Sequence, residues 1–247
     1  MDKFVEISNV RKRYKNAEFE SLKGVSFSVH QGDIFGILGP NGAGKTSLIS
    51  IMCGIIGATD GSVSYFMNGE HKTVNQMRSE IGYVPQDFAL YPELTAKQNL
   101  YYFGALYNLS KQQIDQQLNK ILPVLGLEKV LQKKVHTYSG GMKRRLNLAI
   151  GILHDPKILF LDEPTVGVDV QSKSAIVRFL QELNQLGVTI VYTSHHMSEA
   201  QELCRTVALI DNGEIVAFDQ LSNLMSEHES ESLEKLFIHL TGIAYRD

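Results

Sequence analysis

The sequence predicts an α/β fold with a mainly parallel core sheet, an N-terminal antiparallel sheet and an inserted helical part. Three short apolar runs indicate the core strands, and they occupy residues 34–38, 158–161 and 188–192. Continuous apolar runs are typical of strands that are covered on both faces. Each run leads directly into residues suited to chemistry, which begin at Gly39, Asp162 and Ser194. Such residues follow the carboxyl ends of strands in open α/β sheets, so we expect all three segments at one edge.

The N-terminal region shows a different pattern, in which apolar and polar residues alternate. The alternation covers residues 4–10 and 25–29, and residues 62–67 resemble a third such strand. Alternation with period two is typical of half-exposed strands in an antiparallel sheet. We therefore expect an antiparallel β part over about residues 1–33 and 60–75 of a single domain that spans residues 1–247.

Helices are predicted between about residues 87 and 155. Thr95 with Gln98, and Ser110 with Gln113, fit the capping-box pattern at helix starts, and Pro123 and Gly126 are expected to interrupt the helices.

A last helix is expected over about residues 232–241, where one apolar stripe recurs at i, i+3, i+4 and i+7: Leu233, Leu236, Phe237 and Leu240. Gly242 is a suitable end for it, and the polar run before it, residues 226–232, is predicted to be a loop. Packing against the body is favoured for this helix over binding a partner.

Composition and charge exclude several classes of protein. The chain has 247 residues, a formal net charge of −3 and only two cysteines, so its composition is that of an ordinary globular protein. The charge gives no support for a nucleic-acid partner. No run approaches the about 18 apolar residues of a membrane span, and residues 1–3 lack a signal-peptide layout. Two distant cysteines also argue against a disulfide framework, and we expect a cytosolic protein.

The strongest chemical motif follows the first core strand. Residues 39–46 read GPNGAGKT and match the pattern G-x-x-x-x-G-K-[ST], between a predicted strand and a predicted helix over residues 46–52. The backbone N–H groups of such a loop surround phosphate oxygens, and a helix N-terminus adds positive charge. Lys45 is expected at the β- and γ-phosphates, and the Thr46 hydroxyl at Mg²⁺. The context disfavours a plain glycine turn.

Two carboxylates, Asp162 and Glu163, follow the second core strand. Buried carboxylates are costly without a cation, and Mg²⁺ is the natural one here. Asp162 is expected to hold the metal and Glu163 to act as general base for the attacking water. Read alone, the pair is explained equally well as a helix N-cap. The phosphate loop favours the functional interpretation.

A second anion site is indicated by Tyr138-Ser-Gly-Gly-Met142. It precedes an apolar helical stripe formed by Leu146, Ala149, Ile150 and Leu153. Glycine disfavours a helix by up to about 1 kcal/mol, so two glycines in a first turn suggest close approach to a ligand. Ser139 as an ordinary N-cap is the alternative.

Two further polar residues lie at predicted strand ends. His195 closes the third core strand and is expected to contact the γ-phosphate, although most single histidines are structural. His196 is expected on the opposite face, because side chains alternate in a strand, so a two-histidine metal site is not expected. Gln86 lies where a strand gives way to the helical part, and on its own it reads as a loop residue.

Together these motifs resemble the nucleotide-binding subunit of an ATP-binding-cassette (ABC) transporter, over nearly the whole chain. The resemblance implies a P-loop NTPase core in which residues 39–46 are Walker A, 158–163 Walker B and 138–142 the signature. It implies Gln86 in the Q-loop, Asp169 in the D-loop and His195 as the switch histidine. Tyr14 fits the position that stacks on adenine, with a core tyrosine as the alternative. The implied ATP-binding residues are Tyr14, Gly39, Pro40, Asn41, Gly42, Ala43, Gly44, Lys45, Thr46 and Ser47.

The resemblance also implies partners and a mechanism. Two such domains pack head to tail, a homodimer being expected, so that Ser139, Gly140, Gly141 and Asp169 of one contact the ATP of the other. Glu163, His195 and Gln86 would then act in hydrolysis, with Mg²⁺ held by Thr46, Gln86 and Asp162. Integral membrane subunits would be moved by this cycle. The chain is thus expected to be peripheral, at the cytoplasmic face of the membrane.

The direction of transport is suggested by the signature. Tyr138, and the run from Met142 to Arg145, resemble the branch that serves exporters of drugs and antibiotics. A soluble ABC-type ATPase with a non-membrane partner is the alternative, although this chain lacks a second cassette or long coiled coil. Intact Glu163 and His195 argue against a regulator that does not hydrolyse nucleotide. A GTPase is also disfavoured, because the sequence has no Asn-Lys-x-Asp guanine motif.

An aromatic cluster follows Gln86: Phe88, Leu90, Tyr91, Tyr101, Tyr102 and Phe103. Two interpretations stay open for it. It is either core of the helical part or a groove that receives a helix of a membrane subunit.

Overall fold

Two units organise the chain in the computed structural model, which describes residues 2–242. The first unit holds the residues up to Arg78 and those from Thr189 onward, and the second spans Ser79–Val188. The first contains β1 (Lys3–Lys12), β2 (Leu22–His30), β3 (Ile34–Leu38), α1 (Lys45–Met52), β4 (Asp60–Met67), β5 (Glu70–Lys72), β8 (Thr189–Ser194), α6 (Met197–Leu203), β9 (Thr206–Asp211), β10 (Glu214–Gln220), α7 (Leu221–Glu227) and α8 (Leu233–Thr241).

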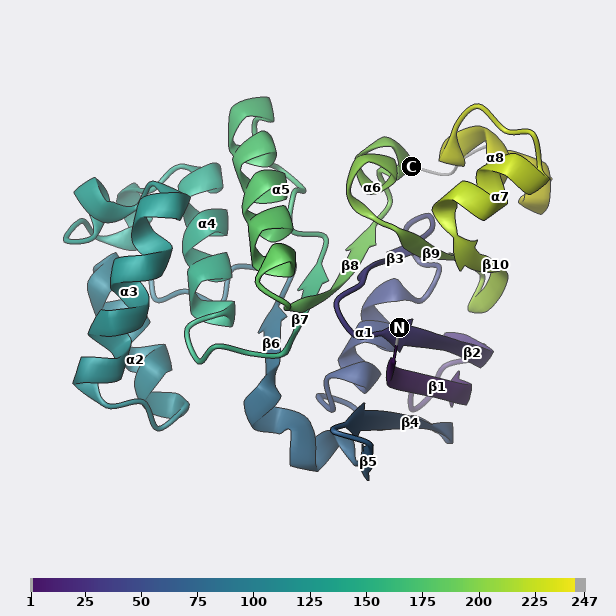
Figure 1. The fold of residues 1–247 in the computed structure, drawn as a ribbon, viewed down its shortest axis with the longest axis horizontal. Helices are drawn as coiled ribbons and strands as arrows, with labels where there is room; N and C mark the ends of the chain where they lie inside the picture. The colour runs from purple at the N-terminus through teal and green to yellow at the C-terminus, as the bar shows by residue number, and fades with distance from the viewer. Residues whose placement is uncertain (1, 243–247) are drawn as a thin grey trace. The chain divides into compact units, whose positions relative to one another are not determined.

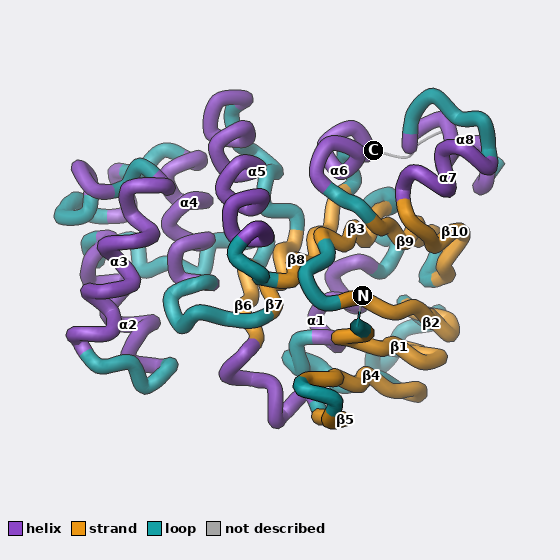
Figure 2. The backbone as a smooth tube through the Cα atoms, viewed as in Figure 1, coloured by secondary structure: helices purple, strands orange, loops and turns teal. Residues whose placement is uncertain are grey.

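The predicted antiparallel sheet is present in the first unit, with strand order β2-β1-β4-β5. In Figure 2 these strands lie in a row beside α1. Val5 pairs with Val29 of β2 on one side and with Tyr65 of β4 on the other. The three alternating segments of the sequence all fall inside these strands, so the prediction is confirmed.

A second sheet in this unit is mainly parallel. β3 pairs in parallel with both β8 and β9, whereas β10 pairs antiparallel with β9. All five residues of β3 and all six of β8 are buried, as their apolar runs predict. The Phe27 ring of the first sheet stacks on Phe35 of the second at 5.0 Å between centroids, and Phe218 of β10 lies 6.0 Å from both. These rings join the two sheets through one apolar core.

The second unit combines a parallel strand pair with a group of helices (Figure 1). Its elements are β6 (Ile81–Val84), α2 (Ala96–Leu106), α3 (Lys111–Leu125), η2 (Glu128–Val130), η3 (Val135–Thr137), α4 (Gly140–Gly151), β7 (Ile158–Asp162) and α5 (Val170–Gln185), while η1 (Val74–Glu80) crosses the boundary between the units in sequence. Both predicted capping boxes are formed, at Thr95 and at Ser110. α2, α3 and α4 contact one another, α5 contacts α3 and α4, and α4 also packs on β6.

Pro123 does not interrupt a helix, contrary to the prediction. It lies within α3, which continues to Leu125 and ends at Gly126, whose φ of +62° is left-handed. A proline inside a helix removes one backbone hydrogen bond and crowds the carbonyl group four residues earlier. The helix bears this cost here and continues for only two residues beyond Pro123. Gly126 does end the helix, because a glycine adopts the left-handed conformation without strain.

The C-terminal helix is confirmed as α8. Ser232 caps it, its side chain accepting a hydrogen bond from the Lys235 N–H, and Gly242 ends it with a φ of +65°. Leu233, Leu236 and Phe237 are buried, and α8 contacts α6 and β10. The apolar stripe is therefore used for packing against the chain itself. Within residues 2–242, no helix combines the length and apolarity that a bilayer span requires.

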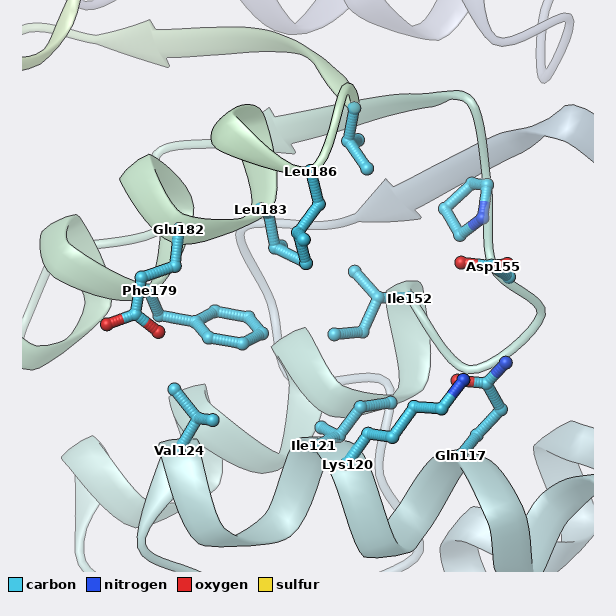
Figure 3. Close-up of a pocket in the computed structure, with 12 residues that line it drawn as sticks. Gln117, Lys120, Ile121, Val124, Ile152, Asp155, Phe179, Glu182, Leu183 and Leu186 are labelled. Carbon is cyan, nitrogen blue, oxygen red and sulfur yellow. The ribbon is translucent and has the colours of Figure 1, made fainter.

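A small apolar hollow of about 200 Å³ lies in the second unit between α3, the end of α4 and α5 (Figure 3). Its walls are mainly Ile121, Val124, Ile152, Phe179, Leu183 and Leu186, with Gln117, Lys120, Asp155 and Glu182 beside them. Phe179 is buried, whereas Leu186 is 82% exposed.

Phe179→Ala is expected to lower the free energy of unfolding by about 3–5 kcal/mol, because it enlarges an existing void that the neighbouring helices cannot close. Urea unfolding of the purified chain measures this change. Leu186→Ala, at the C-cap of the same helix, is the control, and it should stay within about 0.5 kcal/mol of wild type. Equal losses in the two variants would contradict the packing described for α5.

Candidate functional site

The phosphate-loop motif connects β3 to α1 in the first unit. Gly44 precedes α1 with a φ of +105°, and a Cβ at Gly39 would lie 2.0 Å from the Ile210 carbonyl oxygen, so both positions require glycine. Lys45 is buried, and its Nζ donates to the carbonyl oxygens of Gly39 and Pro40 at 2.9 and 3.0 Å. The loop thus holds an ammonium group at its centre, as an anion site requires.

Tyr14 lies beside the start of α1. Its hydroxyl is 3.0 Å from the Ser47 Oγ, the Lys12 Nζ is 5.1 Å from the centre of its ring, and its side chain is 44% exposed. The alternative of a core tyrosine is therefore wrong. An exposed ring next to a phosphate loop can stack on a planar base. Asn41, Gly42 and Thr46 are likewise exposed.

His195 follows β8 at the edge where the phosphate loop begins. Leu38 of β3 pairs with Ser194, and the Gly39 N–H donates to the Ser194 carbonyl oxygen at 3.3 Å. The expectation for His196 is wrong, because its ring centroid lies 4.0 Å from that of His195. β8 ends at Ser194 and His196 is the N-cap of α6, so strand alternation does not extend to these two residues.

Gln86, Asp162 and Glu163 meet in the second unit, where β6 and β7 end together. Val84 pairs in parallel with Leu161, and the Gln86 Nε2 donates to the Glu163 Oε2 at 3.4 Å. Asp162 and Glu163 are 1% and 4% exposed. The N-cap interpretation of this pair is wrong, because the next helix, α5, is capped by Asp169.

Glu163 also has a strained backbone, with a φ of +47°. The left-handed conformation costs a residue other than glycine of order 1–3 kcal/mol, and such strain clusters at functional sites. No sequence pattern signals it. A strained backbone and a buried carboxylate thus coincide at the residue that the sequence predicts as the general base.

The signature segment begins α4. The Ser139 Oγ accepts a hydrogen bond from the Met142 N–H, so Ser139 is an N-cap, while Ser139 and Gly140 are exposed. Gly141 is buried, and a Cβ there would lie 2.4 Å from the Ser172 Oγ and 3.2 Å from an Asp169 carboxylate oxygen. The chain's own packing therefore requires Gly141. A Cβ at Gly140 would meet only the Gly167 carbonyl oxygen, at an ordinary contact distance of 3.4 Å.

Asp169 caps α5 directly beside Gly141. Its carboxylate accepts a hydrogen bond from the Ser172 N–H at 2.9 Å. This N–H, followed by the Ser172 hydroxyl, holds the pKa of Asp169 below its usual value, so the group stays ionised. The segment that begins α4 and Asp169 thus lie together.

Arg144 was not anticipated from the sequence, where it is the middle of three consecutive basic residues, Lys143 to Arg145. It is 3% exposed, and its guanidinium donates to the carbonyl oxygens of Pro85, Gln86 and Val166. A basic residue on a helix is normally solvated, so no signal in the sequence marks this one as buried.

The structure therefore assembles the predicted residues into three groups. Tyr14, residues 39–47 and His195 belong to the first unit, whereas Gln86 with Asp162 and Glu163, and Ser139 to Gly141 with Asp169, are two groups of the second. Among the described residues, no cluster of three or more His, Cys, Asp and Glu side chains forms a metal site by itself.

Comparison with known proteins identifies the family. The family profile described as "ABC transporter" matches residues 22–166, more than half of the chain. The chain belongs to the ABC transporter ATP-binding proteins. It is accordingly an ABC-type ATPase, and the mainly parallel sheet, the antiparallel β part and the inserted helices are those of an ABC cassette.

Among its relatives are two proteins of Bacillus subtilis (strain 168). The linearmycin resistance ATP-binding protein LnrL is 37% identical over 95% of this chain and 75% of its own length. The ABC transporter ATP-binding protein NatA is 30% identical over 95% of this chain and 96% of its own length.

Solved structures of ABC cassettes share the fold. One is described as the ATP-binding subunit of an ABC transporter and has a TM-score of 0.84 at 26% identity, covering 96% of this chain and 99% of its own. Another is the dimeric cassette MJ0796 in a post-hydrolysis state bound to ADP and Pi, with a TM-score of 0.77 at 27% identity over 88% and 98% of the two chains.

Gly141→Ala is expected to lower the free energy of unfolding by about 1–3 kcal/mol, because the added methyl overpacks the contact between α4 and α5. Chemical denaturation of the purified chain measures this. Gly140→Ala is the matched control and should be neutral or gain up to about 1 kcal/mol, since alanine favours a helix and meets no close atom. A loss at Gly140 as large as that at Gly141 would contradict the packing.

Proposed function

We propose that this ABC ATPase powers a membrane exporter of drugs, antibiotics or other small molecules. The hydrolytic half of the proposal rests on Glu163, a buried, strained carboxylate that accepts a hydrogen bond from Gln86. The transport half is supported by its relatives, because LnrL is named for linearmycin resistance and the YbhF protein of Escherichia coli (strain K12), 32% identical, is called a probable multidrug ATP-binding protein. Tyr138 and the basic residues after Met142 support the same branch.

ATP binding is proposed for the first unit. The N–H groups of residues 39–47 surround the phosphates, and the Lys45 ammonium exchanges its two carbonyl partners for phosphate oxygens. The exposed Tyr14 ring stacks on the adenine. His195, which follows the strand beside the loop, contacts the γ-phosphate.

Mg²⁺ suits the oxygen donors of this chain. In this proposal Mg²⁺ would be held by the Thr46 hydroxyl, the Gln86 side chain and the Asp162 carboxylate. Mg²⁺ is bound in this way, through few protein oxygens and substrate phosphates, rather than in cages formed by protein alone. The buried Asp162 supplies the charge that such a site needs. When bound, the ion neutralises charge on the phosphates.

In hydrolysis, Glu163 accepts a proton from the attacking water, and Gln86 holds the Glu163 carboxylate in position. His195 donates a hydrogen bond to the γ-phosphate as negative charge shifts during the reaction. Phosphoryl transfer depends chiefly on such positioning and charge stabilisation.

The signature group acts on a second copy of the chain in this proposal. Ser139 and Gly140 are exposed at the N-terminus of α4, where helical N–H groups attract an anion. Together with Gly141 and Asp169 they close over the ATP of the partner. The dimeric form of the MJ0796 cassette supports this assembly, and a homodimer gives two equivalent sites.

The membrane partner is proposed to dock on an aromatic surface formed by Phe88, Tyr91, Tyr102 and Phe103. The first three are 40%, 45% and 43% exposed, so the alternative that this cluster is core does not hold for them. Tyr91, Tyr102 and Phe103 contact one another with ring centroids 4.9–6.1 Å apart. An exposed apolar patch of this kind is typical of a docking surface. Docking there supports the proposed location, which is peripheral at the cytoplasmic face of the membrane.

Glu163→Gln is expected to lower kcat for ATP at least about a hundredfold, because the amide cannot accept the proton of the attacking water. Phosphate release at saturating Mg-ATP measures this, and nucleotide binding should be retained. Glu182→Gln, an exposed residue of the same unit, is the control with unchanged kcat. If Glu163→Gln kept wild-type turnover, Glu163 would not be the base.

A tagged Glu163→Gln chain, isolated from detergent-solubilised membranes in Mg-ATP, is expected to carry a second copy of itself and a multi-span membrane protein. Adding Tyr102→Glu should remove the membrane protein while leaving the ATP-dependent dimer, because it puts a charge into the aromatic surface. Adding Leu186→Glu, at an exposed apolar residue elsewhere in the unit, should remove neither. Recovery of soluble partners alone would favour a soluble ABC-type ATPase.

A further inference from the structure

Arg144 occupies an unusual place for a charged side chain. It is 3% exposed on α4, the helix that begins at the signature. Its burial is the main cause that lowers the pKa of the guanidinium, and the nearby Asp87, Asp162 and Glu163 carboxylates only partly oppose it. Its Nε is buried with no hydrogen-bond partner among the described residues. Burying a charge with incomplete partners is costly, and an apolar residue of similar size is often as stable.

The guanidinium contacts both segments that carry the hydrolytic pair. Nη1 donates to the Gln86 carbonyl oxygen at 2.8 Å and to that of Pro85 at 3.2 Å, while Nη2 donates to the Val166 carbonyl oxygen at 3.4 Å. Val166 lies one turn beyond Glu163, and its N–H donates to the Glu163 carbonyl oxygen. One side chain thus spans the strand ends of β6 and β7.

The planar fork of an arginine suits this arrangement. Its N–H groups point in fixed directions, so a single guanidinium can bond carbonyl groups of two separate segments at once, which a lysine ammonium on a flexible stem does not reproduce. The same guanidinium lies over the Phe88 ring, with its Cζ 4.7 Å from the ring centroid. Packing on this ring limits the rotation of the fork.

We propose that Arg144 is a positioning residue for hydrolysis, which fixes the Gln86 backbone so that the Gln86 amide reaches the Glu163 carboxylate. The inference rests on the proposed function, since it needs Glu163 to act as the base. Arg144 itself does not contact the reacting atoms in this proposal. Its effect passes through the Gln86 carbonyl oxygen, then the Gln86 Nε2, to the Glu163 Oε2.

A double-mutant cycle on the full chain tests the proposal. Arg144→Lys is expected to lower kcat about tenfold while leaving KM for ATP and the melting temperature nearly unchanged, because the carboxylate is held less well and the phosphate loop is untouched. In a Gln86→Ala background the same change should lower kcat less than about twofold, because the side chain through which Arg144 acts is gone. A general structural role would lower kcat by the same factor in both backgrounds.

Arg145→Lys is the matched control, because the Arg145 guanidinium donates to the Leu125 and Gly141 carbonyl oxygens and not to Gln86. Its effect on kcat, whatever its size, should be the same in both backgrounds.

Arg144→Gln is measured as a second variant, in case the lysine variant folds poorly. Glutamine leaves no buried charge and keeps a planar hydrogen-bond donor. Equal effects of the Arg144 variants in both backgrounds overturn this inference alone. Wild-type turnover that is absent, or unaffected by Glu163→Gln, overturns the proposed function and this inference with it.

Discussion

The register of two parallel strand pairs is the constraint on which the site depends. Leu38 lies opposite Ser194 in one pair, and Val84 lies opposite Leu161 in the other. Because parallel strands end at the same edge, the residues that follow them are brought together from distant parts of the sequence. A shift of one residue in either pair would turn every buried side chain of a strand to its other face, so the core fixes the register and the register places the chemistry.

Two residues near the strand ends of the second unit, Glu163 and Arg144, have features that lower the stability of the folded chain. Glu163 has a left-handed backbone and a buried carboxylate, and Arg144 is buried with an unpaired Nε. Strain and incompletely paired buried charge persist only where the surrounding structure determines them. Here the surroundings are the two strand ends and the first turns of α4, all within the second unit. The cost of these features supports assigning them to hydrolysis rather than to folding.

The signature shows how two neighbouring glycines can differ, one being required by packing and the other left exposed. The motif reads as a ligand site because glycine is unfavourable in a first helical turn. The geometry separates its two glycines: Gly141 gives room to Ser172 and Asp169, and Gly140 stays exposed beside Ser139. The exposed pair is free to approach a ligand outside the chain. A dimer would thus use backbone atoms that the monomer leaves uncovered.

Sequence by itself determined the three apolar core strands, the three alternating strands, both capping boxes, the phosphate loop and the family, because these depend on local spacing and on residue types. It also placed Asp162, Glu163 and His195 at strand ends. It was wrong about Pro123 and about His196, since the outcome in each case depends on where a helix or strand ends. Only the tertiary structure decided that Arg144 is buried and joins Gln86 to Val166, and that Tyr14 is exposed beside α1. Burial of one basic residue among three depends on contacts across sequence separations of 22 and 58 residues, which no local pattern encodes.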